Sequence, residues 1–252
     1  MRKTLIGASF ALVLAACAGG AVPGLMMATV APSESIEAAL TDPRRPATDV
    51  ERDALRHPRE VLAFAGVQPG WRVADIGPGA GYYTRLFSVA VGDQGRVFAI
   101  DRPSTPERAR PILAVAPLYP NITVVQQGYQ DWSVDEPLDA IFISQIYHDF
   151  HLAQSGIDVP RLNREMFAAL KPGGVLVIID HAAAPGSDVS VTGTLHRIDQ
   201  AQVVRELAAA GFVLEEESEL LRNPADDRSE RVFESDIRGR TDQFVLRFRK
   251  PA

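Results

Sequence analysis

The stretch Arg72-Val-Ala-Asp-Ile-Gly-Pro-Gly-Ala-Gly-Tyr-Tyr-Thr84 decides the fold of this chain. Its short apolar run, Val73 to Ile76, predicts a buried strand, and the glycines that follow predict a tight turn into a helix beginning near Tyr82. Glycine suits a turn that bends sharply and approaches a ligand closely, because it has no Cβ atom. The helix N-terminus adds unpaired N–H groups that can face the same ligand. The stretch therefore predicts a ligand-binding turn.

The spacing of the glycines separates two kinds of nucleotide-type cofactor. A dinucleotide fingerprint, G-x-G-x-x-G, would need a third glycine where Tyr82 stands. The chain instead has an acid two residues before the first glycine, in the order Asp75-x-Gly77-x-Gly79-x-Gly81. This pattern resembles the first motif of the class I S-adenosylmethionine-dependent methyltransferases, in which the acid helps to hold the methionine portion of the cofactor. The resemblance implies S-adenosylmethionine as cofactor, with these four residues and Tyr82 around it; a tight turn that binds nothing is the alternative.

Strands and helices alternate after this turn. Near-continuous apolar strands separated by helices indicate a parallel sheet covered on both faces. The pattern resembles the class I methyltransferase fold, an α/β fold with a seven-stranded, mostly parallel, doubly wound sheet and an antiparallel last strand. We expect one domain over 36–252, with N-terminal helices within 36–68, one of them running from Thr48 through Leu62 despite Pro58. The expected strands are 73–76, 96–101, 122–126, 138–144, 175–180, 212–215 and 243–248, and the expected later helices are 107–115, 159–170 and 199–210.

Three further residues are predicted to contact the cofactor. Asp101 ends the second strand, about 20 residues after Gly81, where an acid can accept hydrogen bonds from both ribose hydroxyls. After the third strand the resemblance implies an acid that contacts the adenine amino group. Asp131 is the candidate, although its offset is slightly long and a surface turn residue is the alternative. Ser144, which ends the fourth strand, completes the predicted cofactor-binding set.

The candidate catalytic residues follow the fourth and fifth strands. Ligands of such sheets bind beyond the carboxyl ends of the strands. Tyr147, His148 and Asp149 follow the fourth strand, His181 follows the fifth, and His196 lies in the next loop. We favour His148 as general base, because imidazole with its pKa of about 6.5 can remove a proton near neutrality. Asp149 would orient it, Tyr147 would shape the acceptor pocket, and His181 and His196 are the reserves; bracing of its own loop is the alternative for His148.

Composition excludes several classes of function. The 252 residues have a formal net charge of −6 and contain no run rich in Lys and Arg, so nucleic acid is not expected as a substrate. One cysteine excludes an intramolecular disulfide, and no Cys/His cluster has zinc-like spacing. We therefore predict no metal site from the sequence.

The N-terminus indicates export. Arg2-Lys3 precedes an apolar run over 5–16, which ends at the only cysteine, Cys17. A basic start, a short apolar core and small residues describe a signal peptide over 1–16. The segment Leu-Ala-Ala-Cys17 also resembles the lipobox of bacterial lipoproteins, which implies a lipidated Cys17, a tether over 17–35 and a membrane-anchored protein on the periplasmic side. An ordinary signal cut further on, or a buried N-terminal helix, are the alternatives.

The leading functional hypothesis is methyl transfer from S-adenosylmethionine to a small-molecule acceptor. The segments Pro-Gly-x-Gly-Tyr-Tyr-Thr-Arg, Tyr-His-Asp and Leu-His-Arg-Ile-Asp resemble those of a group of predicted exported bacterial methyltransferases. The rival hypothesis is a non-catalytic exported protein that keeps the fold and binds a nucleoside-like or S-adenosyl ligand. A nicotinamide oxidoreductase would need the missing glycine at position 82. The charged link Leu221–Asp242 is expected to be a flap over the site or a mobile loop.

Overall fold

The computed structural model describes residues 32–105 and 110–252. The predicted signal peptide and Cys17 lie outside these residues, as does the predicted tether up to residue 31, and α1 (Pro32–Leu40) shows that residues 32–35 are helical. Within the described ranges, no helix has the length and apolar character that a membrane span requires. Lipidation stays a prediction that mass spectrometry of the mature N-terminus would check: a modified Cys17 is expected, and any other first residue would contradict it.

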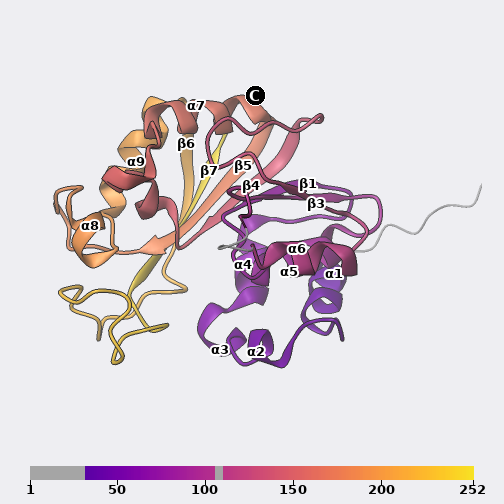
Figure 1. Ribbon diagram of the computed structural model, residues 1–252, viewed down its shortest axis with the longest axis horizontal. Coiled ribbons are helices and arrows are strands. Elements are labelled where there is room, and N and C mark those ends of the chain that lie inside the picture. The colour runs from indigo at the N-terminus through magenta and orange to yellow at the C-terminus, as the bar shows by residue number, and fades with distance from the viewer. Residues whose placement is uncertain (1–31, 106–109) are drawn as a thin grey trace, which may run out of the picture.

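In the described part of the chain, seven strands form one sheet in the order β3-β2-β1-β4-β5-β7-β6 (Figure 1). The first five strands pair in parallel, whereas β7 runs antiparallel to β5 on one side and to β6 on the other. This order confirms the predicted class I methyltransferase fold. The strands are β1 (Arg72–Ile76), β2 (Arg96–Ile100), β3 (Ile122–Val125), β4 (Leu138–Ser144), β5 (Leu170–His181), β6 (Val213–Ser218) and β7 (Gln243–Arg249).

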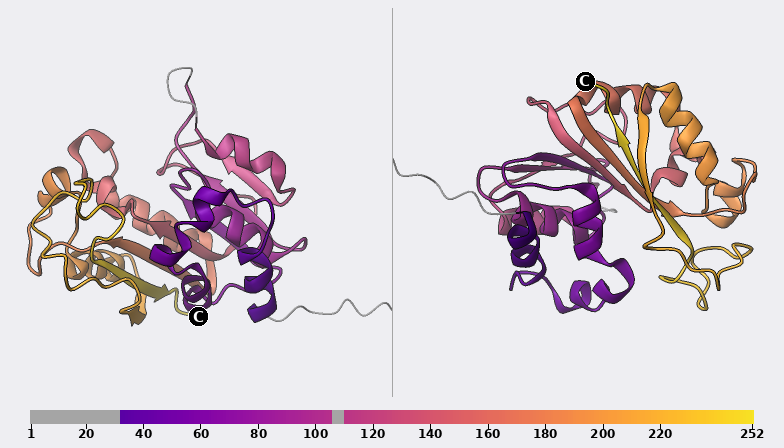
Figure 2. Two further views of the ribbon diagram at one scale, coloured as in Figure 1. Left: turned by 90° about the horizontal axis from the view of Figure 1, so that it is seen from below. Right: turned by 180° about the vertical axis from the view of Figure 1, so that it is seen from behind.

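Helices cover both faces of the sheet (Figures 1 and 2). One face packs against α1, α4, α5 and α6, and the other packs against α7 and α9. Short 3-10 segments, η1 to η3, complete the connections. Beyond α1, the helices and 3-10 segments are α2 (Ala47–Val50), α3 (Asp53–Arg56), α4 (Pro58–Ala65), α5 (Tyr82–Val91), α6 (Ile112–Val115), η1 (Ala116–Leu118), η2 (Tyr147–His151), η3 (Ala153–Ser155), α7 (Val159–Ala169), α8 (Val191–Leu195) and α9 (Gln200–Ala209).

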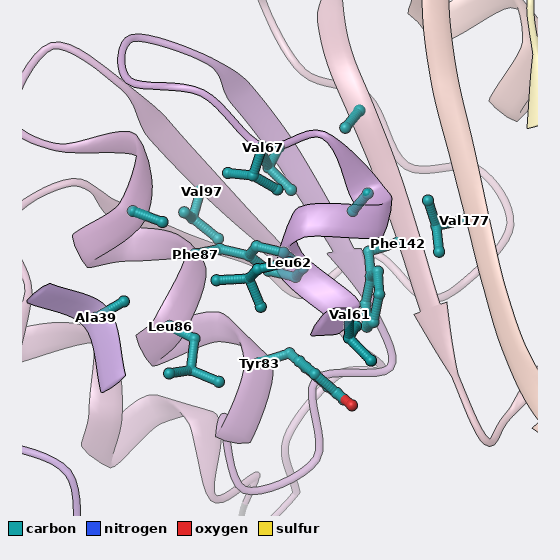
Figure 3. Packing of buried hydrophobic residues seen from close by; sticks show 14 of the residues in the cluster. Ala39, Val61, Leu62, Val67, Tyr83, Leu86, Phe87, Val97, Phe142 and Val177 are labelled. Atoms are coloured by element: carbon teal, nitrogen blue, oxygen red, sulfur yellow. The ribbon is translucent and has the colours of Figure 1, made fainter. Parts of the chain in front are cut away.

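Alternation along each strand fills the two hydrophobic layers. Val97 and Phe142 point to the α5 side, whereas their neighbours Phe98 and Ile141 point to the α7 side. Figure 3 shows the first layer, in which Phe87 of α5 packs edge-on against Phe142 with the ring centroids 4.9 Å apart. Each such side chain contributes roughly 1.5–3 kcal/mol when fully buried. The layers hold β1, β2, β4 and β5 rigidly, so their carboxyl ends form a fixed edge.

The prediction of a single helix from Thr48 through Leu62 is wrong. The chain forms α2, α3 and α4 instead, with a turn at 51–52 and a break at His57, whose φ of 44° lies in the left-handed region. Pro58 causes the break: it has no N–H and fits at the first position of α4, where none is needed. The break lets α3 lie over the turn after β1.

The predicted helix over 107–115 is shorter in the structure, where α6 begins at Ile112 and passes into η1. Residues 106–109 lie outside the described ranges. Asp199 caps α9 as predicted, because its carboxylate accepts a hydrogen bond from the N–H of Ala201. The link Leu221–Asp242, yellow in Figure 1, lies beside α8, where Val232 N–H donates to the Leu195 carbonyl.

Candidate functional site

The turn after β1 opens onto a cavity. Gly77, Gly79 and Gly81 have φ angles of 74°, 56° and 81°, a region that favours glycine. A Cβ on Gly79 would meet nothing within 4 Å, so this glycine faces open space. A Cβ on Gly77 would lie 2.6 Å from Ile146 Cδ1, and one on Gly81 would lie 3.2 Å from Ile112 Cδ1. Gly79 therefore leaves room for a ligand, whereas Gly77 and Gly81 leave room for neighbouring side chains.

This cavity, called here the glycine-turn cavity, has a volume of about 210 Å³. It brings together the predicted Asp75, Tyr82 and Ser144 with residues of α3 and of the β4 end. It is lined by Arg52, Arg56, Asp75, Gly77, Pro78, Gly79, Ala80, Tyr82, Tyr83, Ser144, Gln145, Ile146 and Asp149.

Asp75 is buried at the floor of the glycine-turn cavity. Its carboxylate accepts a hydrogen bond of 2.5 Å from the Thr84 hydroxyl. Burial raises the pKa of Asp75 to about 7, although the hydrogen bond from Thr84 opposes the shift. A buried carboxylate with so little compensation would be stabilised by a cationic ligand group. This fits the ammonium or the sulfonium of the predicted cofactor.

Arg52, the N-cap of α3, and Arg56, its last residue, form the opposite wall, and sequence reasoning missed both. Arg56 lies with its guanidinium carbon 4.8 Å from the Tyr82 ring centroid and donates a hydrogen bond of 2.9 Å to Gln145 Oε1. Burial lowers the pKa of Arg56. Arg52 lies 5.3 Å from the same ring. Guanidinium groups suit a carboxylate, which the methionine portion of the cofactor would supply. The sequence feature that could have indicated them is Pro58, because the break before it places α3 over the cavity.

Asp101, predicted to end the second strand, comes directly after β2 and is fully buried. Arg110 holds it with two hydrogen bonds of 2.6 and 2.8 Å, and the Tyr129 hydroxyl donates a third at 3.1 Å. Within the described residues, Oδ2 accepts from Arg110 Nε alone, and a carboxylate oxygen can accept twice. Asp101 does not line the glycine-turn cavity, so its contact with a ribose hydroxyl stays a prediction.

The structure corrects the prediction for Asp131, because it does not bring this residue to the crevice at the carboxyl ends of the strands. Its side chain is 64% exposed and forms an ion pair with Arg161 of α7. Its φ of 71° is the left-handed turn conformation that Asp tolerates well. The alternative weighed for it, a surface turn residue, describes what the structure shows.

Four side chains from three segments of the chain meet at the rim beside the glycine-turn cavity. His148 Nδ1 lies 2.7 Å from Asp180 Oδ1, and the His148 backbone N–H donates to Asp180 Oδ2, also at 2.7 Å. On the other side of the ring, His148 Nε2 lies 3.2 Å from Asp149 Oδ1. His196 Nδ1 lies 3.2 Å from the same Asp149 oxygen. Asp180 belongs to β5 and His196 is the C-cap of α8, so the fold joins segments about 50 residues apart.

The charge state of His148 argues against its predicted role as general base. Burial lowers the pKa of the ring, but Asp180 and Asp149 outweigh burial and raise it to about 10. The side chain is only 3% exposed, and both ring nitrogens have carboxylate partners. With no other cation bound, the ring holds its proton at neutral pH and cannot take another.

Two other candidates lie away from the open space. The Tyr147 hydroxyl is 2.9 Å from Glu206 and accepts from Asn163 at 2.8 Å, in the layer beneath the rim. Tyr147 therefore braces η2 against α7 and α9 and does not shape a pocket. His181 is buried with Nδ1 2.7 Å from the Thr241 hydroxyl, and burial lowers its pKa to about 4.

His196 and Asp149 face a second cavity, called here the rim cavity, of about 250 Å³. It shares Ile146 and Asp149 with the glycine-turn cavity, so the two spaces meet at these side chains. Half of its walls are apolar or aromatic. The lining residues are Arg102, Tyr129, Ile146, Asp149, Phe150, Leu152, Gln154, Ser155, Ile157 and His196.

Comparison with known proteins identifies the family of this chain. The family model of the protein-L-isoaspartate(D-aspartate) O-methyltransferases matches residues 57–183, which include the glycine turn and the His148–Asp149 segment. The chain belongs to this family. It is therefore a class I S-adenosylmethionine-dependent methyltransferase, and S-adenosylmethionine is its cofactor. The sequence predictions of a methyltransferase and of S-adenosylmethionine as its cofactor are confirmed. The family match does not support the alternative of a nicotinamide oxidoreductase.

Individual relatives cover different parts of this methyltransferase. Protein-L-isoaspartate O-methyltransferase 1 of Arabidopsis thaliana is 32% identical over 124 residues, 44% of this chain and 46% of the plant protein. The ubiquinone/menaquinone biosynthesis C-methyltransferase UbiE of Vibrio campbellii is 30% identical over 190 residues, 75% of this chain and 65% of its own length. The chain thus spans about half to two thirds of these relatives.

A solved structure extends the likeness of fold. The S-adenosylmethionine-dependent methyltransferase from Aquifex aeolicus superimposes with a TM-score of 0.57 at 22% identity, and the match covers 88% of this chain and 99% of that one. At this identity the likeness concerns the fold. It includes nearly the whole described domain of this methyltransferase.

Proposed function

We propose that this methyltransferase transfers the methyl group of S-adenosylmethionine to a small-molecule acceptor in the rim cavity. The observation that supports this most is the meeting of the two cavities at Asp149. A space of about 250 Å³ with apolar and aromatic walls suits a compact acceptor. The quinone-biosynthesis relative also matches more of the chain than the isoaspartate relative does, 75% against 44%.

The residues of the glycine-turn cavity would hold the cofactor from several sides. Asp75 would face its cationic groups, and Arg52 and Arg56 its carboxylate. Asp101 would accept a ribose hydroxyl beyond the end of β2. Bound S-adenosylmethionine supplies a methyl group already activated by its sulfonium. The task of the protein is then to align the acceptor and exclude water.

The acceptor would approach from the side of Asp149 and His196. A bond forms between its nucleophilic atom and the methyl carbon while the carbon–sulfur bond breaks, and a proton leaves the acceptor if it arrives neutral. His148, being protonated and buried, does not remove that proton in the state described. A protein acceptor is the second candidate, favoured by the isoaspartate family match over 57–183.

The rival hypothesis of a non-catalytic binding protein shares the cofactor site and differs at the rim. Calorimetry with S-adenosylmethionine and its demethylated product, followed by a search for methylated small molecules, separates the two. Cofactor binding without turnover on any acceptor would favour the rival.

The Asp101→Asn variant is expected to bind S-adenosylmethionine about 5- to 150-fold more weakly, because a ribose hydroxyl loses a charged acceptor worth about 1–3 kcal/mol. Titration calorimetry measures the change. Asp131→Asn, which removes the same charge at an exposed position, is the control and should bind as wild type does. A wild-type protein that gives neither heat nor thermal stabilisation with millimolar cofactor would refute the proposed function; equal affinity of the two variants would remove Asp101 from the site.

A further inference from the structure

We propose that His148, Asp149 and His196 bind a divalent transition-metal ion at the rim. One ligand atom from each of the three lies within 4.8 Å of the others. Two imidazoles and one carboxylate are a ligand set that zinc and iron(II) sites of enzymes use, with further positions left for water or substrate. The sequence pattern predicted no metal site, because His196 lies 47 residues from Asp149 and the three residues have no local spacing typical of metal ligands.

The distances fit a metal centre. Bonds of about 2.0–2.2 Å in tetrahedral geometry separate neighbouring ligand atoms by about 3.3–3.5 Å. His148 Nε2 and His196 Nδ1 each lie 3.2 Å from Asp149 Oδ1, close to this separation. The two nitrogens lie within 4.8 Å of each other and would have to approach to about 3.3–3.5 Å. An ion could enter with small side-chain shifts.

Asp180 supplies the outer partner that such a site requires. A metal-binding histidine usually donates its other ring N–H to a carboxylate, which fixes the tautomer and the ring orientation. Asp180 accepts at 2.7 Å from His148 Nδ1 and also from the backbone N–H groups of His148 and His181. It thereby aims Nε2, whose proton the ion would replace, toward Asp149. Asp149 and Asp180 together supply two negative charges to balance a divalent cation.

The fold fixes His196 firmly in this position. Its φ of 53° lies in the left-handed region, a conformation that costs a non-glycine residue free energy and needs support. The neighbouring Arg197 is fully buried and bound to Asp226 by hydrogen bonds of 2.8 and 3.0 Å. The Phe233 ring packs at 4.8 Å against the His196 ring. The link Leu221–Asp242, which contains Asp226 and Phe233, thus holds the third ligand rather than covering the site freely.

The location gives the ion a role that rests on the proposed function. Asp149 lines both cavities and His196 lines the rim cavity, so an acceptor there could bind the ion's open position. A divalent ion lowers the pKa of a hydroxyl that coordinates it. It would release the acceptor's proton to solvent, a step for which His148, held by Asp180 at Nδ1 and by the ion at Nε2, has no free nitrogen.

Titration of the chelator-treated full-length protein with Zn²⁺ tests the site. Wild type should bind one equivalent, whereas Asp149→Asn and His196→Gln should bind at least about 100-fold more weakly and Asp180→Asn about 10- to 100-fold more weakly. His151→Gln is the matched control, because His151 lies on the same 3-10 segment but pairs with Glu206 at 3.1 Å. Co²⁺ in place of zinc should give the strong visible absorption of four- or five-coordinate cobalt, lost in the two ligand variants.

Binding of S-adenosylmethionine, measured without metal, keeps the two proposals apart. The His196→Gln variant should retain wild-type cofactor affinity. Absence of stoichiometric Zn²⁺ binding, or equal Zn²⁺ affinity in wild type and both ligand variants, would overturn the metal site even if the cofactor binds. Stoichiometric Zn²⁺ binding without cofactor binding would uphold the metal site and refute the proposed function.

Discussion

Replacement of Gly79 by valine is expected to abolish measurable binding of S-adenosylmethionine while the fold is retained. A Cβ at this position meets no protein atom within 4 Å, so the branched side chain would occupy the space over the turn where the ligand lies. The protein itself would tolerate the change apart from the strain of a φ of 56°, which costs about 1–3 kcal/mol for a side chain in the left-handed region. Calorimetry with the cofactor, together with circular dichroism, measures both halves of this expectation.

Gly66→Val is the matched control. Gly66 also has a positive φ, 71°, and open space around it, but it ends α4 far from the glycine turn along the chain and lines neither of the two cavities. The control should lose similar stability and bind the cofactor normally. Normal binding by Gly79→Val, or equal loss of binding in both variants, would contradict a ligand seated on Gly79.

The Asp75→Asn variant is expected to be more stable than wild type at pH 8 and equally stable near pH 3.5. The pKa of Asp75 is raised from about 3.8 in the unfolded chain to about 7 in the folded protein. The folded state therefore binds the proton more tightly, so wild-type stability falls as the pH rises from about 4 to 7 and stays low above that. The full shift corresponds to at most about 4 kcal/mol, and we expect a gain of about 1–4 kcal/mol for the neutral amide.

Thermal unfolding between pH 3.5 and pH 8 measures this difference. Asp135→Asn removes the same charge from an exposed position and should leave the pH dependence of stability unchanged. The gain in Asp75→Asn should come with weaker cofactor binding, because the amide cannot balance a cationic group. A variant that is less stable than wild type at pH 8 would show that the buried Asp75 carboxylate does not lower the free energy of unfolding.

Stability and function thus conflict at the same carboxylate. Within the described residues, the buried Asp75 accepts one side-chain hydrogen bond, from Thr84, whereas the buried Asp180 has three donors. This difference indicates that Asp75 has acceptor capacity left for a ligand, whereas Asp180 is used to position His148. A cationic cofactor would lower the pKa of Asp75, so we regard its unfavourable apo environment as part of the binding site.

The sequence by itself determined the fold and the cofactor. Apolar runs of strand length, the Asp75-x-Gly77-x-Gly79-x-Gly81 spacing and Asp101 are local patterns, and local patterns are what a single sequence displays directly. They placed the turn, the strand order and the edge of the sheet where ligands bind. They failed at Thr48–Leu62, where one proline outweighed helical periodicity.

Only the tertiary structure decided the rim. Asp149, Asp180 and His196 are brought to His148 by the parallel pairing of β4 with β5 and by the return of the chain through α8. The charge of His148 depends on these neighbours, and so does the choice between a base and a metal ligand. Arg52 and Arg56 likewise reach the glycine-turn cavity through the break of the chain at His57. Residues distant in sequence fix one another's protonation and orientation through contacts of about 3 Å, and no spacing along the chain reveals such contacts before the chain is folded.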